Sequence, residues 1–280
     1  MPCPGASWNA TQRPTTHSLE RENDGFRALV TIDATGRCRI RSRHGRPWTE
    51  QFPELAGICG HVDGPSVLDG EIVVLGADGR PSFKALSARL AGARRHHRPA
   101  TFVAFDVLEV AGDPVTESPW TRRWAILEGL VLDDERAVAM IVCDDGPALF
   151  ATTAQMGVEG IVAKRRESPY RCGPRRPRAW LKTKHRGAGF FDLVGWRPSA
   201  RSRPDVVVLA EDGRYTGTAI VALPADQRTA LHRFIDRYGR LGGSTIVVPA
   251  GAQLRVEYTE RSVRACLREA VARELRPRVT

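Results

Sequence analysis

Isolated carboxylates inside apolar, strand-like segments are the feature that most limits how this chain can fold. The segments are Ser66–Leu75 (SVLDGEIVVL), Thr101–Leu108 (TFVAFDVL) and Gly157–Lys164 (GVEGIVAK). An unpaired charge is costly inside a protein core. We therefore expect Glu71 and Glu159, which interrupt or begin such segments, to face a cleft rather than the core.

Short strands and helices alternate through the first two thirds of the chain. Two alternating segments joined by the turn DATG predict a hairpin, two segments have helical spacing, and a further strand follows a basic loop. The hairpin segments are 25–31 and 38–42, the helical segments are 83–90 and 119–130, and the further strand is 180–184. Antiparallel sheets mixed with helices indicate an α+β domain at 19–187. It follows a polar, Pro- and Thr-rich segment, 1–18, that we expect to be flexible.

The pattern changes after His185–Gly189 (HRGAG), a run typical of a hinge. Short strands follow, with a helix that begins after Pro224. The strands are predicted at 192–196, 206–209, 215–221, 245–248 and 254–258, and the helix at 225–238. Such strands with an intervening helix suit a small OB-like barrel at 190–280. Near the end of the chain, four apolar residues have a spacing that also permits a helix: Val263, Leu267, Ala270 and Val271.

The charge of the chain favours polyanionic partners. The 42 lysines and arginines outnumber the 32 aspartates and glutamates, which gives a formal net charge of +10. Nucleic acid, nucleotides and acidic membranes are the classes that such a surface attracts, although an arginine-rich genome would raise the pI in the same way. Lysine occurs only at Lys84, Lys164, Lys182 and Lys184. Because lysine can be deprotonated and arginine cannot, these few lysines are candidates for a chemical role.

Cysteine usage and hydropathy indicate an intracellular protein. The six cysteines form no C-x-x-C pair and do not cluster with the seven histidines, which argues against a Cys/His metal site. We find no signal peptide, lipidation motif or apolar run of about 18 residues. We therefore expect a cytoplasmic protein with no membrane association.

Six short motifs, in this order and spacing, resemble those of ATP-dependent DNA ligases. They are DGFR at 24–27, SRHG at 42–45, LDGE at 68–71, FDVL at 105–108, EGIVAK at 159–164 and WLKTK at 180–184. The resemblance runs from about Leu19 to Tyr258. The flanking text WTEQFPEL and YRCGPRRPRAWLK is most similar to small bacterial ligases and to the ligase modules of bacterial end-joining systems.

This resemblance implies an adenylation (nucleotidyltransferase) domain followed by an OB-fold domain. In that family a lysine attacks the α-phosphate of ATP, AMP passes to the 5′-phosphate at a nick, and a 3′-hydroxyl displaces AMP. The implied cofactors are ATP and Mg²⁺ or Mn²⁺, because phosphoryl transfer depends on cations for the phosphate and carboxylates for the metal. The implied partners are nicked double-stranded DNA and end-joining proteins, and we expect a monomer.

The resemblance also assigns residues to roles. The nucleotide-binding residues would be Arg27, Arg43, Glu71, Phe105, Lys182 and Lys184, and the metal ligands would be Glu71 and Glu159. Lys182 and Lys184 lie two apart on a strand and so point to the same face, where both can reach one phosphate. An alternating apolar strand, however, more often carries its phenylalanine in the core, so Phe105 on its own would be interpreted as a core residue.

Contacts to the DNA backbone are assigned to basic residues of one strand end and the loop after it. They are Lys164, Arg165, Arg166, Arg175 and Arg176. Arginine contacts to phosphate give sequence-independent, salt-sensitive affinity, which suits a nick. For Lys164 a solvated strand end is an equal alternative.

One position departs from the family pattern. The first motif of the family is K-x-D-G-x-R, and here the sequence is Glu22–Arg27 (ENDGFR), so glutamate stands at the position of the nucleophilic lysine. Arg21 cannot replace it, because its guanidinium is not a usable nucleophile at neutral pH. A carboxylate would also repel the α-phosphate, and an acyl-adenylate would be a reactive mixed anhydride. We therefore predict loss of self-adenylation.

Several interpretations remain open for such a chain. It is a degenerate ligase that still binds nicks or nucleotide, an enzyme that seals only pre-adenylated ends, or a sequence altered at one codon. A non-catalytic DNA-binding module is the alternative from a different class, and RNA ligase or capping-type transfer is a more distant one.

Overall fold

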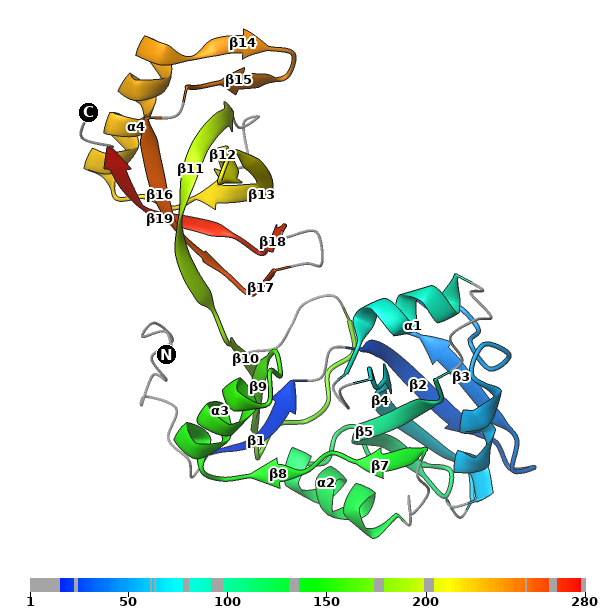
Figure 1. The fold of residues 1–280 in the computed structure, drawn as a ribbon. Helices are drawn as coiled ribbons and strands as arrows, with labels where there is room; N and C mark the ends of the chain where they lie inside the picture. The colour runs from blue at the N-terminus through cyan, green and yellow to red at the C-terminus, as the bar shows by residue number, and fades with distance from the viewer. Residues whose placement is uncertain are drawn as a thin grey trace. The chain divides into compact units, whose positions relative to one another are not determined.

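The computed structural model describes residues 16–22, 25–60, 62, 64–77, 81–91, 98–130, 136–173, 179–198, 204–249, 251–261 and 266–277. The described residues divide into two compact units, one within Trp8–Lys184 and the other within His185–Thr280. Figure 1 shows the two units and their elements. In the described residues no helix is long and apolar enough to cross a membrane.

Two antiparallel sheets form the framework of the Trp8–Lys184 unit. The smaller sheet has the strand order β10-β9-β1-β8, and the larger has the order β3-β2-β4-β5-β6, with β7 added to β5 as a parallel strand. The smaller sheet consists of β1 (His17–Glu22), β8 (Val142–Cys143), β9 (Gly160–Arg165) and β10 (Trp180–Lys184). The larger consists of β2 (Phe26–Ile32), β3 (Cys38–Ser42), β4 (Ser66–Val74), β5 (Ala100–Val110), β6 (Asp113–Pro114) and β7 (Ala137–Ala139).

Helices cover the apolar faces of these sheets. They are η1 (Pro53–Gly60), α1 (Phe83–Leu90), α2 (Trp120–Gly129) and α3 (Gly146–Gln155). The main core joins apolar residues of β2, β4 and β5 to Leu55 and Ile58 of η1 and Leu127 of α2. A second, smaller core packs Leu19 of β1 and Ile161 of β9 beneath α3 (Figure 1). The smaller sheet therefore buries one face, whereas the larger sheet also carries a small second cluster of Val73 in β4, Val103 in β5 and Met140.

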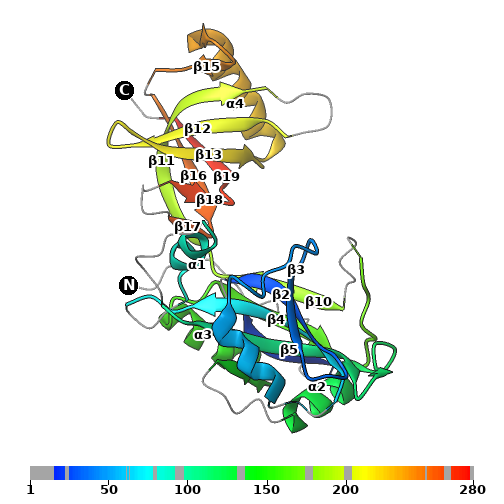
Figure 2. The same cartoon turned by 90° about the vertical axis from the view of Figure 1, so that its right-hand side faces the viewer.

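A closed ring of five strands forms the second unit. They are β11 (Gly187–Arg197), β12 (Val206–Glu211), β13 (Arg214–Val221), β16 (Ala252–Tyr258) and β19 (Val271–Pro277). They pair in the order β11-β12-β13-β19-β16 and back to β11, with β13 and β19 parallel and the other pairs antiparallel. The helix α4 (Ala225–Tyr238) lies between the third and fourth of them in sequence. This is the topology of an OB barrel (Figure 2).

The structure corrects three expectations from the sequence. β1 begins at His17, so His17 and Ser18 belong to a strand and not to a flexible segment. The strand expected at 245–248 exists as β15 (Thr245–Val247), but it forms a hairpin with β14 (Arg240–Gly242) and the ring is closed by β19 instead. The helical alternative near the end is wrong for its described part, because Leu267–Arg268 is strand β18, paired with β17 (Glu260–Arg261), and Val271–Pro277 is β19. Backbone pairing with β13 and β16 outweighs the local apolar spacing there.

Candidate active site

The smaller sheet has one apolar face and one charged face. Leu19, Ile161 and Ala163 alternate with the charged positions and pack against Leu149 and Phe150 of α3. On the other face, the β-ladder sets the charged residues level with one another across β1, β9 and β10: Glu22, Gly160 and Lys184 at one level, and Glu20, Val162 and Lys182 at the next. Side chains directly opposite each other in a sheet share a face. With Lys164, which is level with Ser18 and Trp180, the sequence thus brings five charged side chains onto one side of this sheet.

Three glutamate–lysine pairs line this region. Glu20 Oε2 lies 2.9 Å from Lys164 Nζ, Glu22 Oε1 lies 2.7 Å from Lys182 Nζ, and Glu159 Oε1 lies 2.5 Å from Lys184 Nζ. The two predicted phosphate-binding lysines are therefore on the same strand, and each is hydrogen-bonded to a carboxylate. Gly160 permits this close arrangement, because a Cβ at this position would lie 2.3 Å from the carbonyl oxygen of Thr183.

Glu22 is the last residue of β1, and only one of its two carboxylate oxygens has a hydrogen-bond partner among the described residues. Its side chain is 5% exposed, whereas that of Lys182 is 42% exposed. Glu22 Oε1 accepts the hydrogen bond from Lys182, and Glu22 Oε2 is buried with no hydrogen-bond partner among the described residues. The position predicted to hold the AMP carrier therefore holds a carboxylate that offers one unfilled acceptor beside an exposed ammonium.

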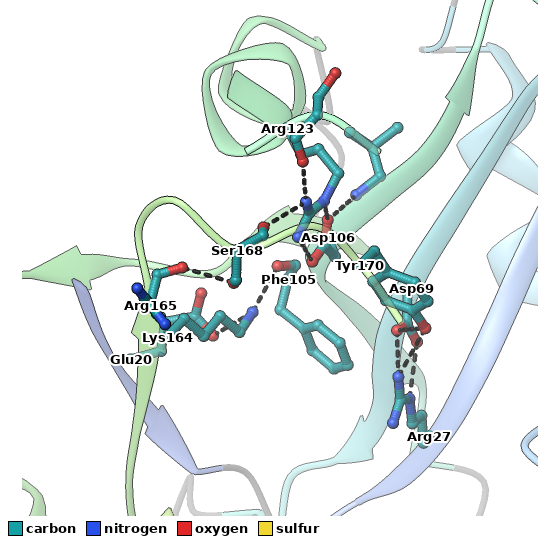
Figure 3. Close-up of polar contacts among 12 residues, drawn as sticks. Glu20, Arg27, Asp69, Phe105, Asp106, Arg123, Lys164, Arg165, Ser168 and Tyr170 are labelled. Carbon is teal, nitrogen blue, oxygen red and sulfur yellow. Dashed lines mark hydrogen bonds and ion pairs between the residues drawn. The ribbon is translucent and has the colours of Figure 1, made fainter. Parts of the chain in front are cut away.

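Lys164 is buried, so its predicted place at a solvated strand end is wrong. Its side chain is 1% exposed, and its ammonium donates to the carbonyl oxygen of Phe105 at 2.7 Å as well as to Glu20 (Figure 3). The rings of Phe105 and Trp180 lie 4.6 and 4.4 Å from Nζ. An ammonium enclosed in this way cannot reach a DNA backbone in this conformation. Lys164 instead joins the two sheets.

Glu20 is buried at the centre of this junction. Burial raises the pKa of Glu20 from 4.5 to about 7, against the opposing effect of Lys164. Glu20 Oε1 has no hydrogen-bond partner among the described residues. Sequence reasoning missed Glu20, although it is spaced two residues before Glu22 on the same strand face and that spacing could have indicated it.

Arg27, Asp69 and Tyr170 form a second cluster, on the larger sheet and the loop after β9. Arg27 binds the two oxygens of Asp69 through Nε (3.0 Å) and Nη2 (2.5 Å), and Tyr170 Oη donates to Asp69 Oδ2 at 2.8 Å. Arg27 Nη2 also donates to Tyr170 Oη at 2.9 Å. Asp69 is fully buried while the Arg27 side chain is 38% exposed (Figure 3). The cluster fixes the orientation of a guanidinium that remains open to a ligand.

Glu71 lies opposite Arg27 on the neighbouring strand. The register pairs Arg27 of β2 with Glu71 of β4, and the Glu71 side chain is half-buried. A Cβ on Gly25 would lie 2.7 Å from Glu71 Cγ and 2.4 Å from the carbonyl oxygen of Ile72. Glycine at position 25 is therefore what allows the chain to pass this close to Glu71 on entering β2.

Phe105 lies outside the main core and points toward the charged pairs. The pairing of β4 with β5 shifts register beside it, and its ring meets Trp180 edge-on with centroids 5.7 Å apart. Arg27 Cζ lies 5.6 Å from the same ring. The predicted stacking of Phe105 on adenine stays a prediction, but the ring is half-buried at the junction between the two sheets, where a ligand of the charged face would lie.

A fully buried ion pair supports the loop that carries Tyr170. Arg123 Nε and Nη2 bind Asp106 Oδ1 and Oδ2 at 2.7 and 3.0 Å, and both side chains are 0% exposed. Arg123 Nη1 donates to the carbonyl oxygens of Ser118 and Ser168 (Figure 3). Asp106, which the sequence suggested as a candidate acid, is thus part of a buried structural ion pair. Tyr170 and Ser168 were missed because loop residues that follow a basic run carry no periodic signal.

The remaining predicted residues lie on the surface or outside the described residues. Arg43 is exposed at the end of β3, and its backbone N–H donates to the carbonyl oxygen of Arg27 at 3.2 Å, which places it beside the cluster. Arg165 is exposed. Arg166 is partly buried and paired with Asp144 at 2.6 Å. Arg175 and Arg176 lie outside the described residues.

The carboxylates at the site suit a shared Mg²⁺ better than a dedicated metal cage. The described residues contain no group of three or more His, Cys, Asp or Glu side chains that could hold a metal ion. Mg²⁺ is commonly held by one or two carboxylates together with ligand phosphates and water. Glu71 and Glu159 fit that mode, with Glu159 having to exchange its bond to Lys184.

Comparison with known proteins agrees with this architecture. Residues 7–184 match the family described as ATP dependent DNA ligase domain. The Mycobacterium tuberculosis "Multifunctional non-homologous end joining DNA repair protein LigD" is 36% identical over 187 residues, which cover 66% of this chain and 24% of that protein. A "Probable DNA ligase" of Streptomyces griseus is 35% identical over 182 residues, covering 60% of this chain and 35% of that protein. The chain thus spans about a quarter to a third of these relatives.

Solved structures are similar over nearly the whole chain. The crystal structure of the ligase domain of M. tuberculosis LigD is 28% identical, with a TM-score of 0.60, and the match covers 98% of this chain and 93% of that one. A structure of a Lig E DNA ligase is similar in fold alone, at 13% identity and a TM-score of 0.62, with 97% of each chain covered. The two-unit architecture is therefore that of an adenylation domain followed by an OB domain.

Proposed function

The chain belongs to the family of ATP-dependent DNA ligase domains, and from that premise we propose that it binds nicked duplex DNA and seals nicks whose 5′-phosphate already carries AMP. The observation that carries this proposal is the pair between Glu22, at the end of β1, and Lys182. In this pair Lys182 is still available to bind phosphate, but a carboxylate stands where the family pattern requires an amine.

The sealing step does not consume a lysine. The 3′-hydroxyl oxygen attacks the 5′-phosphorus, a phosphodiester P–O bond forms, the phosphoanhydride bond to AMP breaks, and the hydroxyl proton is released to solvent or base. Catalysis of such a transfer is mainly positioning and charge neutralisation. Arg27, Lys182 and Lys184 are the cations that would hold the phosphates, and Glu71 and Glu159 are the oxygen ligands for Mg²⁺, which would add further positive charge.

Position 22 cannot form the usual covalent intermediate. An amine gives a durable phosphoramide, whereas Glu22 would give a mixed anhydride that water cleaves readily. Its negative charge, fixed 2.7 Å from Lys182, also opposes the approach of a polyphosphate. We propose that self-adenylation is absent for this reason, and that the adenylated end comes from another enzyme.

DNA binding would rest on the basic surface of the adenylation unit. Arg165 is exposed, and 42 basic residues give the chain its excess of positive charge. Since relatives include proteins named for non-homologous end joining, we place the activity in DNA repair with end-joining proteins as partners. Arg165→Gln should reduce the slope of log K against log salt by about 1, which a nick-binding titration across salt concentrations measures.

The test is a pair of assays on the native chain and Glu22→Lys. Incubation with radiolabelled ATP and Mg²⁺ should leave no stable AMP adduct on the native chain, and Glu22→Lys should gain one. A synthetic 5′-adenylated nick should be sealed by the native chain without ATP. A stable adduct on the native chain would refute the loss of self-adenylation, and absence of sealing at saturating protein and Mg²⁺ would refute the sealing function.

A non-catalytic nick-binding module is the second candidate, and the same Glu22–Lys182 pair favours it. It predicts tight, salt-sensitive binding to a nick with no sealing in the native chain or in Glu22→Lys. Chemistry restored by that single substitution would exclude it.

A further inference from the structure

Each cation of the candidate site is matched by one carboxylate. Among the described residues this holds for four cations: Arg27 with Asp69, Lys164 with Glu20, Lys182 with Glu22, and Lys184 with Glu159. Glu71 adds a fifth acid on β4, and Arg43 adds an exposed cation beside Arg27. This set therefore holds as many carboxyl groups as cations.

Glu22 is the carboxylate of this set whose charge would act on a phosphate bound at Lys182. Two of the four carboxylates have a structural role, because Asp69 orients Arg27 and Glu20 holds the buried Lys164. Glu159 lies just before β9 and is a candidate Mg²⁺ ligand. Glu22 is nine-tenths buried with Oε2 unpartnered, and the Lys182 that it neutralises is the more exposed of the pair. A bound polyphosphate at Lys182 would have to share that ammonium with a fixed negative charge.

We infer that this site is selective for a nucleoside monophosphate, free or as the adenylated 5′ end of DNA, over a nucleoside triphosphate. AMP, and the disubstituted pyrophosphate of an adenylated end, each carry fewer negative charges than a triphosphate and leave Glu22 Oε2 free to accept a hydrogen bond from a ligand hydroxyl or amine. A triphosphate brings additional negative charges to a site whose cations are already paired. The identity of the adenylated end rests on the proposed function, whereas the selectivity is a property of the site alone.

Equilibrium titration with adenosine, AMP and ATP tests this, each with EDTA and with Mg²⁺. The native chain should bind AMP at least as tightly as ATP. Glu22→Gln keeps the shape of the side chain and removes its charge, and should raise the affinity for ATP relative to AMP by about tenfold or more. Glu211→Gln is the matched control, because it removes one charge from the exposed pair with Arg261 in the other unit and should leave the ratio unchanged.

A native chain that binds ATP more tightly than AMP, or that binds no AMP at millimolar concentration, overturns the inference, and so does an unchanged ratio in folded Glu22→Gln. If that variant does not fold, Lys182→Gln serves instead: it leaves Glu22 unmatched and should lower ATP affinity further relative to AMP. Sealing of a 5′-adenylated nick is scored separately. Loss of sealing with the selectivity intact refutes the proposed function alone, and sealing without the selectivity refutes only this inference.

Discussion

Two ion pairs in the adenylation unit, Asp106–Arg123 and Glu22–Lys182, differ in burial and in how many of their hydrogen bonds are satisfied. Asp106 and Arg123 are both 0% exposed and bind each other through two hydrogen bonds. The remaining groups of this pair are satisfied by the backbone, since Asp106 Oδ1 accepts from the N–H of Val107 and Arg123 Nη1 donates to two carbonyl oxygens. Glu22 and Lys182 share one hydrogen bond, one carboxylate oxygen is unpartnered, and Lys182 is 42% exposed.

This difference in burial and hydrogen bonding distinguishes an ion pair that stabilises the fold from one that can respond to a ligand. A buried pair with every hydrogen bond satisfied holds its surroundings in one arrangement, here the loop from Ser168 to Tyr170 against β5. In a pair with an unpartnered carboxylate oxygen and an ammonium open to water, the hydrogen bond between the two groups can be replaced by one to a ligand at little cost in free energy. The same residue types therefore serve as scaffold in one place and as a ligand-responsive group in the other.

Removing one partner of the buried pair gives the largest expected effect. Asp106→Asn leaves the Arg123 guanidinium buried without a counter-charge, and should reduce the free energy of unfolding by about 3–5 kcal/mol. Denaturant unfolding followed by circular dichroism measures it. Asp144→Asn, which breaks the surface pair with Arg166, is the control and should cost less than about 1 kcal/mol. Equal costs for the two variants would contradict the distinction drawn above.

Glu20 should make stability depend on pH in an unusual direction. Its pKa is about 7 in the folded chain and 4.5 in a free side chain, so between these values the folded state holds a proton that the unfolded state has released. Stability from this group is therefore full below about pH 4.5 and falls as pH rises to 7, by about 3 kcal/mol. Glu20→Gln removes this dependence.

The measurement is the difference in unfolding free energy between Glu20→Gln and the native chain at pH 4.5, 6 and 7.5. The difference should move in favour of the variant as pH rises. Other carboxylates cancel, because both chains contain them. A difference that is flat with pH, or that moves toward the native chain, would mean that Glu20 is ionised in the folded protein throughout.

Sequence patterns predicted helices, strands and motif positions better than they predicted which side chains contact each other. The helices at Phe83–Leu90 and Ala225–Tyr238 have the predicted bounds, because each has a start signal and regular apolar spacing. Helix α3 was not predicted, although Asp145 caps it and Pro147 stands in its first turn. Its apolar face is short and mixed with alanine and threonine, so periodicity is weak there.

The side chains around the site could not be placed by sequence alone. Lys164 was expected either to contact DNA or nucleotide or to end a strand in solvent, but it is enclosed by aromatic rings and a carboxylate from β1, β5 and β10. Asp69 stands in a motif that the sequence singled out, yet the register of β2 with β4 sets it opposite Leu29, and only the placed side chains show that it binds Arg27. Such contacts depend on long-range pairing, which no local pattern encodes.

Tyr170 binds both members of a third pair, Arg27 and Asp69, and its loss should have an intermediate effect. Tyr170→Phe keeps the ring near Trp180 and removes the hydroxyl that binds Asp69 and Arg27. Hydrogen bonds to charged groups contribute about 1.5–3 kcal/mol each, but Arg27 and Asp69 keep their bond to each other, so we expect a net cost of about 1–2 kcal/mol. Affinity for AMP should fall with it, since Arg27 loses one of its two supports. A variant with native stability and native AMP affinity would show that Tyr170 only fills space.

Glu22→Gln should change stability least of all. The substitution weakens one hydrogen bond to Lys182, but it also removes the charge on a buried carboxylate with an unpartnered oxygen, and the freed ammonium is open to water. These two effects oppose each other, so the free energy of unfolding should stay within about 1 kcal/mol of the native value. Glu159→Gln, at the partly exposed pair with Lys184, provides the comparison and should behave alike. A loss above about 2 kcal/mol for Glu22→Gln alone would mean that Glu22 is part of the scaffold, as Asp106 is, and not a group that a ligand can displace.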